Sequence, residues 1–275
     1  MCLSFRHRNP LHCILPPHVL TEVAKGSDAA ALAALRTLNL DMTFRAMRSL
    51  PQAPAAPAIG TAAVAGQPNR TVHSANNAET LPGVVKRTEG QPDTGDVAVD
   101  EAYKGLGATY ALFFEAYGRD SIDDEGMPLL ATVHYGNQYN NAFWNGQQMV
   151  FGDGDGELFN RFTIAIDVIG HELTHGVVED EGPLYYVTQS GALNESLADV
   201  FGSLVKKQTL NQKADQADWL VGQGLFTANV NAKALRSMKA PGTAYDDPRL
   251  GRDPQPDHMR KYVNTTADNG GVHIN

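Results

Sequence analysis

The chain has 275 residues, 42% of them hydrophobic, so it can bury a large core and divide into two lobes. Its 22 basic and 31 acidic side chains give a net charge of −9 at pH 7. This balance argues against nucleic acid as a partner, because such a site needs a basic face, and against attachment to anionic lipid. No apolar run reaches the roughly 18 residues of a membrane span, so we expect no membrane partner either.

The N-terminus contains both cysteines of the chain, Cys2 and Cys13. They could form one disulfide, but no disulfide can link parts of the main body, so the fold needs no oxidising compartment. The first residues are basic, but prolines and His12 interrupt the following stretch before the apolar region of a secretory signal can form. We therefore expect a protein that is cytoplasmic or exported without a conventional signal peptide.

Residues 1–50 are predicted to be a short segment with a helix in its second half. Either Ser27 or Asp28 can cap this helix. Leucines at helical spacing in Ala-rich sequence predict its apolar side: Leu32, Leu35 and Leu38.

An uncharged stretch rich in Ala, Gly and Pro follows over residues 51–68. Such composition is typical of an exposed linker, where proteolysis concentrates. We predict four parts: a short propeptide-like segment over 1–50, a cleavable linker over 51–72, a β-rich lobe over 73–162 and a helical lobe over 163–275.

The β-rich lobe is expected to contain one long helix and several strands. The helix begins near Asp100, and its apolar side is predicted to carry Val99, Tyr103, Leu106, Tyr110, Phe113, Phe114 and Tyr117. Residues 129–151 contain β-branched and aromatic residues in alternation, interrupted by Gly and Asn, which predicts antiparallel strands.

The helical lobe is expected to open with two helices, from near Thr163 and from near Asn194. The second carries an apolar stripe that we predict to be packing: Leu197, Val200, Phe201, Leu204 and Val205. The first contains His171, Glu172 and His175 in the pattern HExxH.

Histidines four residues apart lie on one helix face, so His171 and His175 can bind one metal ion. Glu172 lies beside that face, where its carboxylate can take a proton from metal-bound water. Glu195 of the second helix would be the third ligand. The fourth position is then left for water, which is the open arrangement of a catalytic zinc site. The alternative is a chance HExxH on an amphipathic helix.

Asp199 lies one turn after Glu195 on the same face. It is well placed to accept a ring N–H from a ligating histidine and so fix its tautomer. The alternative interpretation is that Asp199 is a solvent-exposed charge on the helix surface. Asn194 is predicted to support the ligands in the same way as Asp199.

Six blocks of the body, in this order, resemble the thermolysin-like zinc metallopeptidases. They are YNNAFWNG at 139–146, GDGDG at 152–156, GHELTHG at 170–176, SGALNES at 190–196, LRSM at 235–238 and DNGGVHIN at 268–275. The resemblance covers roughly residues 95–275. It implies an α+β fold with zinc in a cleft between a β-rich N-terminal lobe and a helical C-terminal lobe, and neutral endopeptidase activity on peptides or proteins.

The resemblance also implies roles around the metal. His171, His175 and Glu195 would bind zinc, and Glu172 would be the general base. Tyr186 and His273 would stabilise the oxyanion of the tetrahedral intermediate, with Asp268 orienting His273.

Further roles implied by the resemblance concern the substrate. Asn141 and Ala142 would hold its backbone along an edge strand. Arg236 would bind the carbonyl beyond the scissile bond. Val168 and Leu235 would line a pocket that favours a hydrophobic residue after that bond.

Residues 13–20, CILPPHVL, resemble the short propeptides of the protealysin-like branch of the family. This implies a self-inhibited precursor whose own propeptide assists folding and blocks the cleft until the linker is cut. The Cys13 thiolate could occupy the open zinc position as a latency switch, since thiolates are good zinc ligands. The alternative is a small buried side chain in a propeptide turn.

Two features depart from the family pattern. Relatives with a double calcium site carry a carboxylate where this chain has Lys206, and an ammonium repels calcium, so we expect zinc but not that calcium site, although Asp167 remains. The chain also stops at Asn275, where relatives continue with further helices.

The departures leave other functions open beside the peptidase. One is a truncated, catalytically inactive relative that binds zinc and peptide. Another is a zinc hydrolase of small substrates, which fits the HExxH pattern but not the peptide-binding strand or Arg236. Our expectation for the assembly is a monomer.

Overall fold

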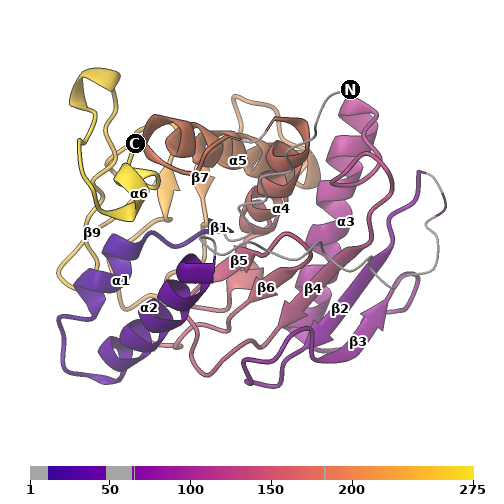
Figure 1. Ribbon diagram of the computed structural model, residues 1–275, viewed down its shortest axis with the longest axis horizontal. Coiled ribbons are helices and arrows are strands. Elements are labelled where there is room, and N and C mark those ends of the chain that lie inside the picture. The colour runs from indigo at the N-terminus through magenta and orange to yellow at the C-terminus, as the bar shows by residue number, and fades with distance from the viewer. Residues whose placement is uncertain (1–11, 48–63, 65, 183) are drawn as a thin grey trace.

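A mixed six-stranded sheet lies against a group of long helices (Figure 1). The computed structural model describes residues 12–47, 64, 66–182 and 184–275. Cys2 and most of the predicted linker lie outside this part of the chain. Across the sheet the strand order is β1 (His12–Cys13), β5 (Ala142–Trp144), β6 (Met149–Phe151), β4 (Leu129–Val133), β2 (Arg70–Ser74) and β3 (Val84–Thr88).

The remaining elements are mostly helical. The longer helices are α2 (Ala29–Met47), α3 (Val97–Tyr117), α4 (Ile166–Glu181) and α5 (Thr188–Thr209). Short ones are α1 (Pro17–Val23), η1 (Phe162–Ile164), η2 (Met259–Lys261) and α6 (Asp268–Gly271). Two small antiparallel pairs follow α5: β7 (Leu220–Val221) with β8 (Arg236–Ser237), and β9 (Asp246–Asp247) with β10 (Gly251–Arg252).

The sheet confirms the predicted α+β class but only part of the predicted pairing. β5 and β6 are antiparallel, as expected, whereas β4 runs parallel to both β6 and β2. The prediction of a wholly antiparallel group over 129–151 was therefore wrong. Period-two alternation identifies a strand, but it contains no information on which neighbour the strand selects.

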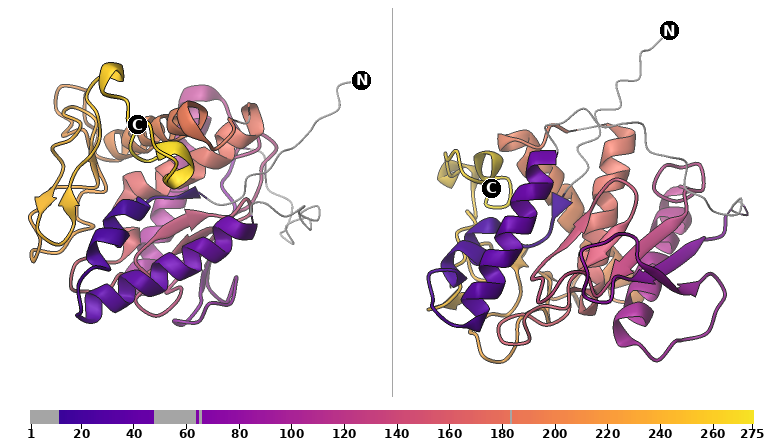
Figure 2. Two further views of the ribbon diagram at one scale, coloured as in Figure 1. Left: turned by 60° about the vertical axis from the view of Figure 1, so that its left-hand side comes forward. Right: turned by 60° about the horizontal axis from the view of Figure 1, so that its bottom comes forward.

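The N-terminal segment supplies one edge of this sheet. β1 pairs antiparallel with β5, so residues before the linker continue a sheet built by the body. Helices α1 and α2 follow β1 and lie beside the strands of the sheet in both views of Figure 2. Asp28 caps α2, because its carboxylate accepts a hydrogen bond from the Ala31 amide at 2.9 Å.

The face that α2 buries differs from the predicted leucine stripe. Leu32 and Leu35 are 55% and 45% exposed, while small residues beside them are buried: Ala30, Ala31, Ala33, Ala34 and Thr37. Alanines allow the helix axis to approach the body closely, which leucines on that face would prevent.

Helix α3 begins and ends as the sequence chemistry dictates. The Asp96 side chain accepts hydrogen bonds from the Ala98 and Val99 amides at its start, and Gly118 adopts φ 69° at its end. Phe114 and Tyr117, expected on the apolar side, are 39% and 56% exposed. The buried stripe of α3 therefore ends near Phe113.

Helices α4 and α5 pack through glycine. A Cβ added at Gly202 would lie 2.4 Å from the Asp167 carbonyl oxygen, so only glycine permits this approach. α5 starts at Thr188, earlier than predicted, and Val200 of its expected packing stripe is 37% exposed. The buried face of α5 instead carries Asn194, Glu195, Ala198, Asp199 and Gly202. None of the described helices is long and apolar enough to cross a membrane.

Candidate metal centre

The close packing of α4 on α5 brings both histidines of α4 to Glu195 of α5. His171 and His175 are completely buried, and their Nε2 atoms lie 3.1 Å apart. The Glu195 carboxylate oxygens lie 3.3 Å from His171 Nε2 and 3.5 Å from His175 Nε2. Ligand atoms bound tetrahedrally at about 2.0–2.1 Å from zinc are separated by about 3.3 Å. The two ring nitrogens and the Glu195 carboxylate therefore have about the spacing of ligands around one tetrahedral ion, with a different carboxylate oxygen nearest to each histidine.

The surroundings of these atoms also fit a metal ion. His171 Nδ1 donates to Asp199 at 2.8 Å and His175 Nδ1 donates to Asn194 Oδ1 at 2.8 Å, so each Nε2 is turned toward the shared centre. Glu195 Oε2 is buried and accepts no hydrogen bond from the described residues. A buried carboxylate oxygen without a donor is costly unless a cation satisfies it. The residues present thus fit zinc.

Asp199 connects the histidine to a second cation. Its carboxylate accepts two hydrogen bonds from the Arg236 guanidinium, at 2.6 and 2.8 Å, in addition to the one from His171. Burial alone would raise the pKa of Asp199, but the Arg236 charge outweighs it and, with His171, lowers that pKa to about 2. Asp199 is therefore an ionised link between α5, α4 and β8.

Glu172 faces the β5 strand next to the centre. Its Oε2 accepts a hydrogen bond from the Trp144 amide at 3.0 Å, and its Oε1 has no hydrogen-bond partner among the described residues. Complete burial raises the pKa of Glu172 well above its ordinary value. The carboxylate is held at one oxygen and can exchange a proton at the other.

Tyr186, His273 and Asp268 form a second group beside Glu195. The Tyr186 hydroxyl contacts Glu195 and lies 3.1 Å from His273 Nε2. His273 Nδ1 donates to the Asp268 carboxylate at 2.8 Å, and the His273 amide donates to the same carboxylate at 3.0 Å. The loop that ends the chain thereby places His273 next to the candidate ligands, as the sequence predicts.

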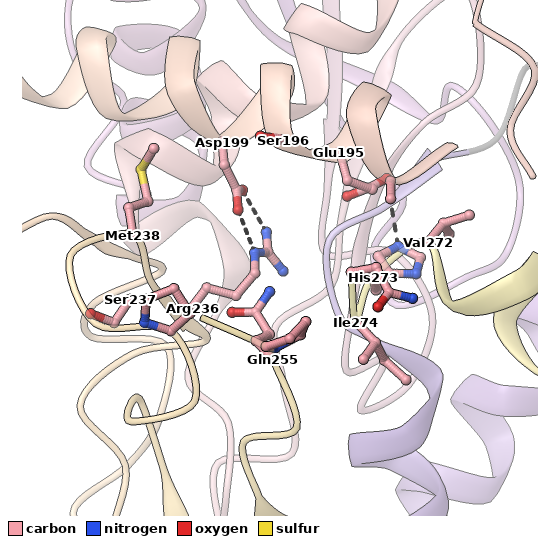
Figure 3. Close-up of a pocket in the computed structure, with 14 residues that line it drawn as sticks. Glu195, Ser196, Asp199, Arg236, Ser237, Met238, Gln255, Val272, His273 and Ile274 are labelled. Carbon is pink, nitrogen blue, oxygen red and sulfur yellow. Dashed lines mark hydrogen bonds and ion pairs between the residues drawn. The ribbon is translucent and has the colours of Figure 1, made fainter. Parts of the chain in front are cut away.

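A pocket of about 220 Å³ is lined in part by Glu195, Asp199, Arg236 and His273. Figure 3 shows Arg236 with Asp199 on one side of it and Glu195 with His273 on the other. Both walls thus carry residues that the sequence analysis selects.

The N-terminal segment passes between the strand and the candidate ligands. The His12 ring stacks on the His175 ring, with 4.0 Å between centroids, and approaches Tyr186 edge-on. His12, His175 and Glu195 each offer a ligand atom, and these atoms lie within 4.8 Å of one another.

Cys13, the predicted latency residue, is not brought into this group. Its side chain belongs to a buried cluster with Tyr139, Phe143 and Val150. Successive side chains of a strand point to opposite faces, so His12 and Cys13 cannot both face the centre. Sequence reasoning chose the stronger metal ligand of the two and missed His12. Side chains alternate between the two faces of a strand, and this alternation around Cys13 was the signal that could have identified His12.

The predicted substrate-binding residues surround the same segment. The Ala142 carbonyl accepts a hydrogen bond from the Ile14 amide at 3.1 Å, and Asn141 Oδ1 accepts one from the Leu15 amide at 3.0 Å. Arg236 Nη1 donates to the Ile14 carbonyl at 3.2 Å. Val168 and Leu235 are buried, at 0% and 2% exposure, in the cluster that contains Ile14.

Lys206 lies where the sequence analysis expects calcium to be excluded. Its ammonium is 3.5 Å from Asp167, 3.1 Å from both oxygens of Asp218 and 3.1 Å from the Leu220 carbonyl. These oxygens are ligands of the kind calcium prefers, and here an ammonium lies among them.

Comparison with known proteins agrees with this geometry. The family model described as thermolysin metallopeptidase, catalytic domain, matches residues 63–179, and the one described as thermolysin metallopeptidase, alpha-helical domain, matches residues 182–275. The chain belongs to the thermolysin family and is a zinc metalloendopeptidase. It resembles in particular the precursor of protealysin from Serratia proteamaculans, at 53% identity and a TM-score of 0.87 over 96% of this chain and 76% of that one. The chain is accordingly a zymogen of the protealysin branch with a propeptide.

Other similar proteins are also named as proteases. An "Extracellular metalloprotease" of Pectobacterium carotovorum is 54% identical over 97% of this chain and 76% of its own length. "Protease PrtS" of a Photorhabdus strain is 49% identical over 95% of this chain and 71% of its own. "Thermolysin" of Alicyclobacillus acidocaldarius is 43% identical over 66% of this chain and 31% of its own.

Proposed function

We propose that the chain is a neutral endopeptidase whose own propeptide inhibits it, and that it cuts before hydrophobic residues with the help of zinc. The observation that carries the proposal is the segment 12–15, which pairs with β5 through β1 and contacts Ala142, Asn141 and Arg236 beside the candidate ligands. A peptide that adds a strand to a sheet edge is held mainly by backbone hydrogen bonds, so many sequences can bind in this way.

The preference for a hydrophobic residue follows from the apolar surroundings of Ile14. The Ile14 side chain is fully buried in the same apolar cluster as Val168 and Leu235. Full burial of such a side chain contributes about 1.5–3 kcal/mol. A charged side chain in its place would instead lose its hydration. We infer that the apolar site occupied by Ile14 receives the side chain of the residue that follows the scissile bond.

The chemistry divides among the residues already described. When bound, zinc polarises the peptide carbonyl and lowers the pKa of its water to about 7. Glu172 takes a proton from the attacking water at its Oε1 and passes it to the leaving nitrogen. His273 and Tyr186 donate hydrogen bonds to the oxyanion, Asp268 holds His273 at Nδ1, and Arg236 fixes the substrate carbonyl on the leaving side.

Self-inhibition follows because the propeptide occupies the positions that a substrate would need. The propeptide uses the backbone acceptors of β5, the guanidinium of Arg236 and the space over His175. A substrate cannot bind there until the propeptide leaves. Cutting the linker would allow this, because the propeptide then becomes a separate, dilutable ligand.

The test compares the chain with Glu172→Gln, each loaded with zinc, freed of the propeptide by limited proteolysis of the linker, and then incubated with casein after the added protease is inactivated. We expect the variant to lose at least about 100-fold in rate, since a general base contributes 10²–10⁴-fold. The variant should still retain zinc, because Glu172 is not a proposed ligand. A matched control is Glu125→Gln, which makes the same change at an exposed carboxylate.

Equal and negligible hydrolysis by both proteins, with zinc bound, would favour the inactive, zinc- and peptide-binding alternative. The comparisons give that alternative no support, because the relatives are named as proteases. Zinc removal by a chelator should abolish activity, and added zinc should restore it.

A further inference from the structure

The propeptide crosses the metal centre in the register of a substrate, and we propose that the precursor hydrolyses its own Cys13–Ile14 peptide bond. This inference rests on the proposed function, because it assigns the first peptide bond that the same site cuts. It concerns a position inside the propeptide, well before the linker over 51–72.

The carbonyl of Cys13 faces His273, one of the two groups assigned to the oxyanion. Its oxygen accepts a hydrogen bond from His273 Nε2 at 2.9 Å. The Tyr186 hydroxyl lies 3.1 Å from the same nitrogen. His273 also donates from Nδ1 to Asp268, so its ring is held with Nε2 directed at this carbonyl. The Cys13 carbonyl thus occupies the position of a scissile carbonyl.

The residues after the bond are held as a leaving group would be. The Ile14 amide donates to Ala142, the Ile14 carbonyl accepts from Arg236, and the Leu15 amide donates to Asn141. These three contacts occur in consecutive order along the chain. A shift of one residue would exchange the two faces of the strand and break all of them.

Side chains on both sides agree with this register. Before the bond, His12 stacks on His175, a proposed metal ligand. After it, the Ile14 side chain fills the apolar cluster that contains Val168 and Leu235. The residue directly after the bond is therefore hydrophobic, which is the class that the proposed function favours.

The reaction is an ordinary hydrolysis and needs only water. The water oxygen adds to the Cys13 carbonyl carbon while Glu172 takes a proton from it. The bond between that carbon and the Ile14 nitrogen then breaks, and the nitrogen receives the proton. One water is consumed, Cys13 keeps a carboxylate, and Ile14 becomes a new N-terminal ammonium.

Because the Cys13–Ile14 bond already lies in the site of its own chain, we expect its cleavage to be intramolecular. The experiment starts from the full chain, purified without metal, and adds zinc at several protein concentrations. Intact-mass measurement follows the products over time. We expect the first product to lack residues 1–13 and to begin at Ile14, at a first-order rate that does not change with protein concentration. Glu172→Gln should give no such product.

Variants at Ile14 test whether the register directs the cut. Ile14→Leu keeps a hydrophobic side chain and should cut at the same bond within about threefold of the original rate. Ile14→Asp should slow it by more than about tenfold, in line with the selectivity of hydrophobic pockets. Thr21→Ala, an exposed position on α1, is the matched control and should change nothing. Circular dichroism of each variant shows whether it has folded.

Two outcomes would overturn the inference. One is a first cut elsewhere, for example in the linker, with the Cys13–Ile14 bond intact. The other is cleavage of this bond at a rate that increases with protein concentration. Casein hydrolysis, measured in the same samples after limited proteolysis of the linker and inactivation of the added protease, separates the two proposals. If casein is cut while Cys13–Ile14 stays intact, the inference fails and the proposed function stands; if neither is cut, the proposed function fails.

Discussion

Asp199 shows how one residue can couple the metal centre to substrate binding. It accepts hydrogen bonds from His171 and from Arg236, which lie on different elements. Charge on Asp199 therefore orients a ligand and also neutralises the buried guanidinium. Sequence spacing identified the first of these contacts, because both residues lie on helices, but Arg236 reaches Asp199 only through the fold.

We predict that Asp199→Asn weakens zinc binding by about 10–100-fold, as loss of an outer-shell partner does. It should also raise KM for peptides, because Arg236 loses its ionised partner. Competition with a chromophoric zinc chelator measures the affinity. Gln189→Ala, at an exposed position in the first turn of α5, is the control. Unchanged zinc affinity in Asp199→Asn would contradict the role of Asp199 as support for His171.

His134 should make stability depend on pH. Its ring donates to Asp153 at 2.8 Å and to Asp96, the cap of α3, at 3.0 Å. The hydrogen bond to Asp153, helped by Asp96, raises the pKa of His134 from 6.5 to about 9 although burial opposes this. A raised pKa in the folded state stabilises the fold fully below about pH 6.5, and this contribution disappears as pH rises through about 9.

We predict that His134→Gln lowers the free energy of unfolding by about 1–2 kcal/mol at pH 6, a figure reduced for partial exposure of the ring. The difference from the unmodified chain should shrink above pH 9. Urea unfolding across this pH range measures it. His258→Gln, at an exposed histidine, should show no such trend. A difference that stays constant with pH would count against the ion pairs of His134.

At the level of the elements, the propeptide helix is held by one buried carboxylate. Asp41 is 2% exposed and accepts hydrogen bonds from Tyr139 at 2.7 Å and Asn141 at 2.8 Å. Both donors belong to the body, and Asn141 also binds the propeptide backbone at Leu15. α2 therefore stabilises the inhibited state at a distance from the metal ligands.

Removal of this carboxylate should loosen the propeptide. Asp41→Ala leaves two buried donors without their acceptor, at a cost of about 1–3 kcal/mol. We expect the uncut precursor to hydrolyse casein roughly tenfold faster as a result, since about 1.4 kcal/mol corresponds to a factor of ten in an equilibrium. Met42→Ala, at a 65% exposed position on α2, provides the control. Equal basal activity of all three proteins would show that Asp41 does not secure the inhibited state.

Helices α2 and α5 show what sequence periodicity could not predict. Helix positions followed from periodicity, yet the buried faces of α2 and α5 were assigned to leucine and valine stripes that are partly exposed. Tight packing through Ala33 or Gly202 selects small residues, and hydrophobicity alone cannot show this. The grouping of His171, His175 and Glu195 was predictable because a metal imposes fixed residue types at fixed helical spacing.

Across the whole molecule, long-range pairing was the part that sequence could not provide. β4 lies parallel to β6, and β1 of the propeptide joins β5 more than a hundred residues away. Such pairing depends on how the entire sheet closes, and no local signal encodes it. The resemblance to a family supplied the overall fold and the role of His273, while the position of His12 over His175 emerged only from the assembled sheet.

Stability of the whole molecule should be independent of calcium because Lys206 already supplies a cation. Its ammonium lies among Asp167, Asp218 and the Leu220 carbonyl, and burial still raises the pKa of Asp167 to about 6. We predict an unchanged Tm when millimolar calcium is added to the zinc-loaded chain.

Lys206→Glu reverses the charge at this position and should make stability depend on calcium. Without calcium, three carboxylates then repel one another beside a buried carbonyl, so Tm should fall. With calcium, the same oxygens become ligands. Calcium at about 100 times its Kd should then restore about 2.7 kcal/mol. Lys206→Met removes the ammonium without adding a carboxylate. This variant should be less stable than the unmodified chain, and calcium should not change its Tm. Differential scanning calorimetry measures all three proteins, and a calcium-dependent Tm in the unmodified chain would refute the substitution of ammonium for calcium.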